Sequence, residues 1–173
     1  MFMKLLYTLE DKEYPYTYID HIRNIARAFV LNDKNEILLE YIYDDDGFGH
    51  RDYYETPGGG IKNGEDLSEG LKREIAEECG YLVEIIGEIG EVDDFYNLIH
   101  RENHNYYFIA RVIGTCDSHL EPDEVKRIKD ISFHSIDESI HLYEKMQDKL
   151  VGKLVKQREL PLLKLLKDTL QSK

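Results

Sequence analysis

Three glutamates, Glu74, Glu77 and Glu78, are spaced so that a helix would bring their carboxylates together. At 3.6 residues per turn, Glu74 and Glu78 lie on one side of the helix and Glu77 lies one step around it. Like charges at this spacing repel one another and destabilise an isolated helix. A divalent cation would remove that conflict. We predict Mg²⁺, which prefers hard oxygen ligands and retains part of its water shell, with Mn²⁺ as an alternative ion.

The segment that carries these glutamates has the signals of a helix with one buried face. Asp66 is a good N-cap, and Glu69, three residues later, completes a capping-box-like pair. Gly80 suits the C-terminal end of the helix. An apolar residue recurs at every fourth position and forms one stripe: Leu67, Leu71, Ile75 and Cys79. The carboxylates therefore lie along the edge of a buried stripe.

A solvated acidic helix is the simplest alternative, but it explains less. It accounts neither for the glycines Gly58, Gly59 and Gly60 before the helix nor for Arg73 inside the acidic cluster. Because glycine lets a backbone approach closely, we predict the Gly58 carbonyl as a metal ligand and Gly59 and Gly60 as substrate contacts. Arg73 can hold a neighbouring carboxylate by a bidentate hydrogen bond and keep it ionised.

The spacing of these residues resembles the Nudix box, G-x5-E-x7-R-E-U-x-E-E-x-G-U, where U is a bulky apolar residue. Here Gly59 is followed at these intervals by Glu65 and then by the run Arg73-Glu74-Ile75-Ala76-Glu77-Glu78-Cys79-Gly80-Tyr81. Only Tyr81 departs, because it stands where an aliphatic residue is usual. The resemblance implies that Arg73 orients Glu74, that Glu77 and Glu78 are the core metal ligands and that Glu65 supports the cluster.

The resemblance also implies a fold, an α/β/α sandwich with a mixed β-sheet between helices, and strands on both sides of one strong helix agree with it. We expect a single domain over residues 1–173. The family pattern covers about residues 21–150 and leaves an extended N-terminal segment and a C-terminal helix outside it.

The activity that the resemblance implies is metal-assisted hydrolysis of a diphosphate linkage in a nucleoside diphosphate joined to another group. The metal would polarise phosphoryl oxygens and lower the pKa of a bound water. The general base varies across the family, and here Glu124 is preferred to Glu121. The substrate stays open among a nucleoside triphosphate, a nucleotide sugar and a dinucleoside polyphosphate. The alternative function is a nucleotide-binding regulatory domain without hydrolysis, although such domains typically lose box carboxylates and all are present here.

Further candidate substrate contacts lie outside the box. Arg27 interrupts the apolar face of a strand predicted at residues 25–31, and a buried arginine needs an anionic partner. That partner is either a protein carboxylate or a substrate phosphate, and we predict substrate. Tyr54, on a short strand before the glycines, is a second predicted contact. Phe95 and Tyr96 could face a substrate base, although core packing is the simpler interpretation.

The remaining elements are predicted from periodicity and turn residues. We expect one short strand within residues 1–20, a returning hairpin strand at 37–43, a polar loop at 44–50, strands at 83–92, 105–113 and 131–133, an acidic loop at 121–124, a helix opening at Ser135 and a last helix after Pro161.

Composition limits the partners. The 173 residues carry a net charge of −13 from 35 acidic and 22 basic residues. Such a charge disfavours binding to a nucleic-acid polymer or an acidic membrane, whereas a small phosphorylated nucleotide remains possible. Cys79 and Cys116 have neither metal-site spacing nor a disulfide pattern, and no stretch reads as a signal peptide or membrane span. We therefore expect a cytoplasmic monomer or homodimer.

Overall fold

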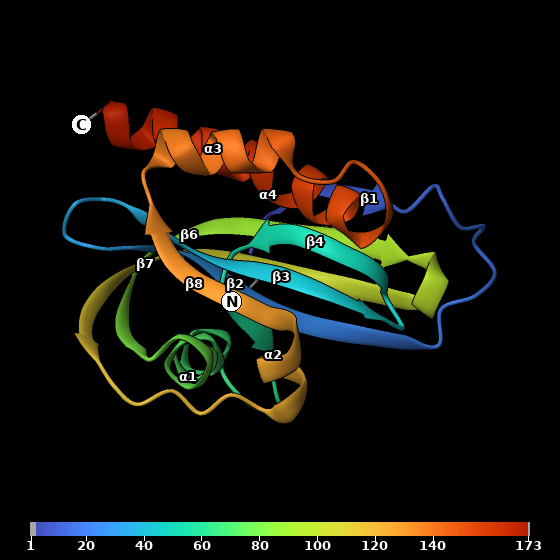
Figure 1. Cartoon of the computed structure of the whole chain (residues 1–173), viewed down its shortest axis with the longest axis horizontal. Helices are drawn as coiled ribbons and strands as arrows, with labels where there is room; N and C mark the ends of the chain where they lie inside the picture. Colours follow the sequence, from blue (N-terminus) through green and yellow to red (C-terminus); the bar gives the residue numbers. More distant parts are fainter. Residues whose placement is uncertain (1–2, 173) are drawn as a thin grey trace.

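Within residues 3–172, the part of the chain that the computed structural model describes, eight strands form one mixed β-sheet (Figure 1). The strands are β1 (Leu5–Glu10), β2 (His21–Leu31), β3 (Ile37–Asp46), β4 (Gly49–Glu55), β5 (Gly58–Gly60), β6 (Tyr81–Tyr96), β7 (Arg101–Thr115) and β8 (Ile128–His134). Their order is β1-β6-β7-β2-β3-β4. Beyond the β2–β3 turn the sheet splits, because β2 pairs with β5 and β3 pairs with β8.

Helices cover both faces of this sheet (Figure 1). α1 (Leu67–Cys79) and α2 (Pro122–Arg127) lie on one face, and α3 (Ile136–Lys145) and α4 (Leu150–Gln171) lie on the other. A short 3-10 helix, η1 (Asn97–Ile99), joins β6 to β7. This layering confirms the α/β/α sandwich with a mixed sheet. Among residues 3–172, no helix is both long and apolar enough to cross a membrane.

The central strand β2 supplies side chains to the cores on both faces, because successive residues of a strand point in opposite directions. Ala28 packs in the core that contains Ile75 of α1, and Phe29 packs in the core that contains Leu162 of α4. All four side chains are almost fully buried. The two faces predicted for residues 25–31 are therefore confirmed.

The capping residues Asp66, Gly80 and Ser135 were also predicted correctly, whereas the Glu69 side chain pairs with Lys72 and does not complete a capping box with Asp66. The Asp66 side chain accepts hydrogen bonds from the backbone N–H groups of Ser68 and Glu69 and caps α1. Gly80 ends α1 in the left-handed conformation, with a φ of 72°. Ser135 caps α3 by accepting from the Glu138 N–H. These signals depend on neighbouring residues alone, which is why sequence reveals them.

The polar loop predicted at residues 44–50 is wrong, because this segment is a tight hairpin. β3 continues to Asp46 and β4 begins at Gly49. The Asp46 side chain accepts from the Phe48 N–H, and Gly49 adopts a φ of 86° that suits glycine. Charged side chains on the two strands pair across the hairpin, Arg51 with Asp46 and His50 with Asp45. Polar composition alone therefore misidentified a strand pair as a loop.

The long strands β6 and β7 extend past the predicted ends at residues 92 and 105. Their extra residues are polar, but they hydrogen-bond inside the sheet. Asn105 Nδ2 donates to the Val92 carbonyl at 3.0 Å and to Asp94 Oδ2 at 2.8 Å, and Asn103 Nδ2 donates to Asp94 Oδ1 at 2.7 Å. Buried amide–carboxylate contacts thus replace the apolar alternation on which strand prediction depends.

Two helix predictions also need correction. The acidic loop at 121–124 runs into α2, which Pro122 opens and a capping box formed by Glu121 and Glu124 stabilises. The last helix begins at Leu150, and Pro161 lies inside it. An internal proline costs about 3 kcal/mol. Apolar side chains on both sides of it are buried and offset that cost: Leu154, Val155, Leu162, Leu163 and Leu166.

Candidate functional site

A cavity of about 440 Å³ lies at the split in the sheet. Its walls come from strands β2 to β7, from α1 and α2 on one side and from α4 on the other. Among the predicted site residues, seven line it: Arg27, Gly58, Gly59, Gly60, Glu74, Glu78 and Glu124. The fold therefore brings the box carboxylates, the glycines and a distant acidic residue to one place.

Arg73 organises the carboxylates at the edge of this cavity. Its Nε and Nη2 donate to the two Glu65 oxygens at 2.8 and 2.9 Å. Its Nη1 donates to Glu74 Oε1 at 2.7 Å and to Glu77 Oε2 at 3.0 Å. The hydrogen bonds from Arg73 lower the pKa of Glu65 to about 2. One guanidinium thus fixes three carboxylates, and Glu74 is held in the orientation that the motif implies.

Glu78 differs from its neighbours because it is buried and only weakly paired. Its side chain is 3% exposed, and its Oε1 lies 3.5 Å from Arg127 Nη2. Its Oε2 is buried and has no hydrogen-bond partner within residues 3–172. Burial, and then the nearby carboxylate of Glu40, raise the pKa of Glu78 to about 11. Such an oxygen at a cavity wall suits a cation, which would supply the missing partner.

The glycines of β5 allow the backbone to approach the carboxylates. A Cβ on Gly59 would lie 2.4 Å from Glu74 Oε2, which is closer than side-chain atoms tolerate. Gly58 has a φ of 143°, and a Cβ there would lie 2.1 Å from the Ala26 carbonyl oxygen. Gly58 therefore requires glycine, whereas a Cβ on Gly59 would displace the Glu74 carboxylate. This agrees with the predicted close approach, although it does not assign a ligand.

Of the two candidate general bases, the structure brings Glu124 to the cavity. Glu124 lines the wall from α2, and its side chain is 17% exposed. One of its oxygens accepts from the Glu121 N–H at 2.8 Å. Glu121 lies outside the cavity lining and serves the N-terminus of α2.

Arg27 lines the cavity and also has a protein carboxylate as its partner. Its Nη1 donates to the Thr56 carbonyl at 2.7 Å, and its Nη2 lies 3.1 Å from Glu55 Oε2. Both ion-pair side chains are 11% exposed. Of the two partners considered for Arg27, the structure shows the protein carboxylate, Glu55. Contact with substrate remains a prediction.

Beneath Arg27, α4 contributes a second set of buried charges. Arg158 Nη1 lies 2.8 Å from Asp94 Oδ2, and its Nη2 lies 3.8 Å from Glu55 Oε2. The neighbouring Glu159 is fully buried. It accepts hydrogen bonds from four donors: the Thr56 N–H at 2.9 Å, the Thr56 hydroxyl at 2.8 Å, the Tyr107 hydroxyl at 2.9 Å and the Tyr143 hydroxyl at 2.6 Å.

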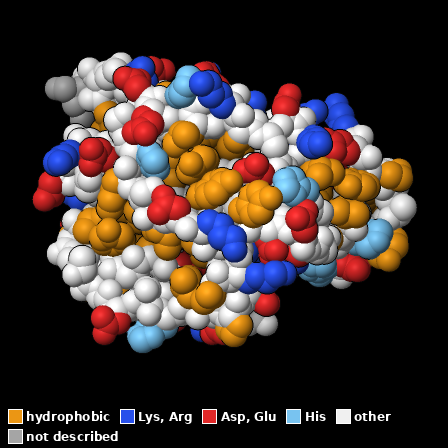
Figure 2. Space-filling model, viewed as in Figure 1, with side chains coloured by type: hydrophobic (Ala, Val, Ile, Leu, Met, Phe, Trp, Pro, Cys, Tyr) orange, Lys and Arg blue, Asp and Glu red, His pale blue; other side chains and the backbone are white. Residues whose placement is uncertain are grey.

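Tyr54 is not placed at the cavity. Successive strand residues face opposite ways, so Tyr53 lines the cavity and Tyr54 points away from it. The Tyr54 ring lies 5.1 Å from the Tyr41 ring and 6.0 Å from the His134 ring, measured between centroids. On this face of the molecule, hydrophobic side chains gather over β3 and β4 (Figure 2). The predicted substrate contact by Tyr54 therefore has no support from the cavity geometry.

The lining also contains residues that were not predicted. Guanidinium groups enter from separate elements: Arg23, Arg51, Arg101, Arg127 and Arg158. The Phe48 ring lies between two of them, 4.0 Å from the Arg51 guanidinium carbon and 5.0 Å from that of Arg101. Tyr96, which the sequence suggested either for contact with a substrate base or for core packing, is 2% exposed, lines the same cavity and donates its hydroxyl to the Phe48 carbonyl. No local sequence pattern links these positions, because only the sheet topology brings them together.

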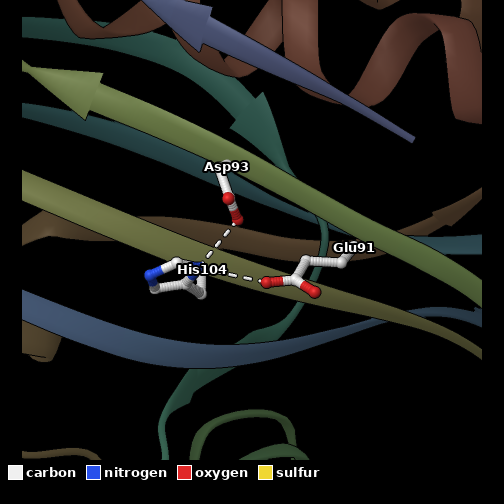
Figure 3. Close-up of side chains that lie close together, drawn as sticks. All are labelled: Glu91, Asp93 and His104. Carbon is white, nitrogen blue, oxygen red and sulfur yellow. Dashed lines mark hydrogen bonds and ion pairs between the residues drawn. The ribbon is translucent and has the colours of Figure 1, made fainter. Parts of the chain in front are cut away.

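A second acidic cluster lies outside the cavity lining, on β6 and β7 (Figure 3). His104 Nδ1 lies 3.0 Å from Glu91 Oε1 and 2.9 Å from Asp93 Oδ1, and its Nε2 lies 3.2 Å from Glu102 Oε1. Although partial burial acts against it, Asp93 and Glu91 hold the pKa of His104 above its ordinary value. These atoms are close enough to bind a metal ion, and protonated His104 would equally neutralise the carboxylates.

Comparisons with known proteins place this geometry among related folds. A family model described as the NUDIX domain matches residues 21–154. The structure is similar to a NUDIX hydrolase from Nitrosomonas europaea, with a TM-score of 0.61 and 20% identity over 79% of this chain and 85% of that chain. A UDP-X diphosphatase is similar with a TM-score of 0.57 and 19% identity, over 91% of this chain and 67% of that chain. An ADP-ribose pyrophosphatase from Streptococcus suis 89-1591 is similar with a TM-score of 0.50 and 17% identity, over 82% of this chain and 88% of that chain. At these identities the structural likeness shows a shared fold. No match was found among curated protein sequences.

Proposed function

The chain belongs to the NUDIX family of pyrophosphohydrolases, and from this premise we propose that it hydrolyses a diphosphate linkage within a small nucleotide. The observation that carries the proposal is the arrangement at the cavity wall. Glu78 presents a buried oxygen with no hydrogen-bond partner among residues 3–172, Arg73 donates to the neighbouring Glu74, and the Gly59 backbone lies against the Glu74 carboxylate.

The residues present fit a hard divalent cation. The donor set consists of carboxylate oxygens and a nearby backbone, which is the ligand type that Mg²⁺ and Mn²⁺ prefer. Glu74, Glu77 and Glu78 would hold the ion, with the Gly58 carbonyl as a further ligand. Glu77 lies outside the cavity lining with 45% of its side chain exposed, so it would bind from the rim. When bound, Mg²⁺ would polarise the phosphoryl oxygens and lower the pKa of the attacking water.

The protein's own residues supply positioning and proton transfer. Arg73, held by Glu65, donates to Glu74 and opposes the rise in the Glu74 pKa that burial causes. Glu124 is the proposed general base that accepts the proton of the attacking water. The water oxygen bonds to one phosphorus of the diphosphate while the bond from that phosphorus to the bridging oxygen breaks. Arg27 is proposed to contact the phosphates from the cavity floor, because a guanidinium offers a planar fork of donors.

The cavity has the size and composition for a nucleotide. Its volume of about 440 Å³ falls in the usual range for small-molecule sites, about 300–1,000 Å³. Phe48 provides aromatic surface for a base, and the carboxylates provide a place for the metal-bound diphosphate. The candidate substrates are a nucleoside triphosphate, a nucleotide sugar and a dinucleoside polyphosphate.

A substrate panel tests this proposal directly. The purified chain is incubated with representatives of the three classes, with Mg²⁺, with Mn²⁺ and with excess chelator, and the products are identified. We expect cleavage at a diphosphate linkage that requires the metal. Full activity in chelator would contradict the metal site. Nucleotide binding without hydrolysis of any compound would instead indicate a regulatory binding domain.

A further inference from the structure

We propose that Arg23 and Arg101 form a second anion-binding site in the cavity, which receives a phosphate beyond the diphosphate that is cleaved. The inference rests on the proposed function for its biological meaning, but the anion site itself does not depend on hydrolysis. Both side chains line the cavity, from the neighbouring strands β2 and β7.

The sheet register places the two arginines side by side. β2 and β7 are parallel, with His21 opposite Arg101, and residues two apart on a strand share a face. Arg23 therefore lies on the same face as His21, whose ring accepts a hydrogen bond from Arg101 Nε at 2.8 Å. A Cβ on Gly60 would lie 2.3 Å from Arg23 Nη2, so Arg23 is close to the glycine strand that adjoins Glu74.

Among the residues that the structure describes, these two guanidiniums lack the carboxylate partners that other arginines of the cavity have. Arg27 pairs with Glu55, Arg51 with Asp46 and Arg158 with Asp94. Within the described chain, residues 3–172, neither Arg23 nor Arg101 forms an ion pair with a carboxylate. Burial and then neighbouring arginines lower the pKa of both groups: Arg27 acts on Arg23, and Arg23 acts on Arg101. Arg23 is exposed at the cavity and Arg101 is partly buried. In a chain with a net charge of −13, two neighbouring cavity arginines that have no carboxylate partner among residues 3–172 indicate that an anionic ligand is their partner.

The chemistry of the site identifies the ligand class. Guanidinium groups bind phosphate oxygens through paired N–H donors. The cleaved diphosphate is assigned to the α1 carboxylates, so these arginines would contact an additional phosphate. That phosphate belongs either to a linear chain of three or more phosphates or to a phosphorylated second group. A nucleotide sugar with a neutral sugar would leave both arginines unpaired, so the site favours the more anionic substrates.

Metal-free anion binding tests the site separately from catalysis. Without metal the α1 carboxylates repel anions, so binding depends on the arginines. Titration calorimetry in chelator compares inorganic tripolyphosphate, pyrophosphate and ribose 5-phosphate. We expect tripolyphosphate to bind at least tenfold more tightly than pyrophosphate if the site takes a linear chain, and ribose 5-phosphate to bind at least as well as pyrophosphate if it takes a phosphorylated second group. Failure of all three anions to bind would overturn the inference.

Matched variants assign the binding to these residues. Arg23→Gln and Arg101→Gln should each weaken binding of the preferred anion at least tenfold. Arg111→Gln is the control, because Arg111 contacts Asn32 and Asn35 outside the cavity, and it should bind like the wild type. The melting temperatures of the two cavity variants should be unchanged or higher, since each removes a repelling charge.

Two results with these variants would also overturn the inference. One is anion binding as tight as that of the wild type in both cavity variants, and the other is a clear fall in their melting temperatures, which would indicate a structural role. Anion binding that depends on these arginines, in a protein that hydrolyses no nucleotide, would remove the proposed function and leave the site standing.

Discussion

Two of the clusters in which several carboxylates surround one basic side chain have different surroundings. In the α1 cluster, Arg73 contacts Glu65, Glu74 and Glu77 beside the cavity. In the β6–β7 cluster, His104 contacts Glu91, Asp93 and Glu102 outside the cavity lining. Proximity of ligating atoms alone would favour the β6–β7 cluster as a metal site.

The difference lies in which cluster can neutralise itself. His104 can take up a proton, and its raised pKa shows that its neighbours favour the charged form. Arg73 is already shared among three carboxylates, and the nearby Glu78 has a buried oxygen with no hydrogen-bond partner in the described part of the chain. Burial and Glu40 raise the Glu78 pKa, so its charged form is unfavourable unless a cation reaches it from the cavity, whereas the β6–β7 cluster has a basic side chain of its own. Burial and access to a cavity therefore distinguish a candidate metal site better than the number of carboxylates does.

The largest expected effect is on catalysis. Glu78→Gln should lower turnover at least a hundredfold, about 2.7 kcal/mol of transition-state stabilisation, because it removes the proposed metal ligand while the fold stays intact. Steady-state kinetics with the best substrate and a thermal melt measure both properties. Glu69→Gln is the control on the same helix, since Glu69 pairs with Lys72 at the surface. Near-normal activity of Glu78→Gln would contradict the proposal that the α1 cluster, and not the β6–β7 cluster, binds the catalytic metal.

A smaller effect is expected for a buried charge that is already paired. Arg27→Lys keeps the charge but loses part of the contacts to Glu55 and Thr56. We expect a loss of about 2 kcal/mol of stability, toward the low end for a disturbed buried pair, measured by urea unfolding. A changed KM or kcat would add a substrate role for Arg27. Unchanged stability together with a raised KM would show that substrate, and not Glu55, is its principal partner.

Metal binding should separate the two clusters. Mg²⁺ at ten times its dissociation constant should stabilise the wild type by about 1.4 kcal/mol, or a few degrees in melting temperature. Thermal melts at constant ionic strength should show this shift in the wild type and in His104→Gln, and should not show it in Glu78→Gln. A shift that disappears in His104→Gln would move the metal site to the β6–β7 cluster.

The smallest effect concerns the pH dependence of stability. A histidine whose folded pKa is raised contributes stability that is fully present below its ordinary pKa of about 6.5 and is lost as pH rises through the folded pKa. The wild type should therefore exceed His104→Gln in stability by about 1 kcal/mol or less in mildly acidic buffer, and the difference should shrink in alkaline buffer. Urea unfolding across this pH range measures it. A difference that does not vary with pH would show that His104 contributes by packing.

Local and periodic signals account for what could be predicted from sequence. The family, the α/β/α layering, the ends of α1 and the two faces of β2 all depend on neighbouring residues or on simple repeats. The cavity arginines depend on β2, β4, β7, α2 and α4 meeting at the split in the sheet, which spacing along the chain does not encode. The predicted strands were too short at the polar ends of β6 and β7 for a related reason. Buried Asn and Asp side chains there hydrogen-bond to one another across the strands. Tyr54 lies outside the cavity lining because one step along a strand reverses the direction of the side chain.

The contacts of Glu159 have a consequence for the order in which the protein acquires its site. The donors that reach this carboxylate come from Thr56, Tyr107 and Tyr143, all of which precede α4 in the chain. During synthesis the box helix and the sheet leave the ribosome first, while α4 is still enclosed in the exit tunnel. Until α4 docks, Thr56 and Tyr107 lack their acceptor and the Arg158 side of the cavity is open. The docking of α4 therefore completes the binding site and the core on its face of the sheet together, as the last step of assembly.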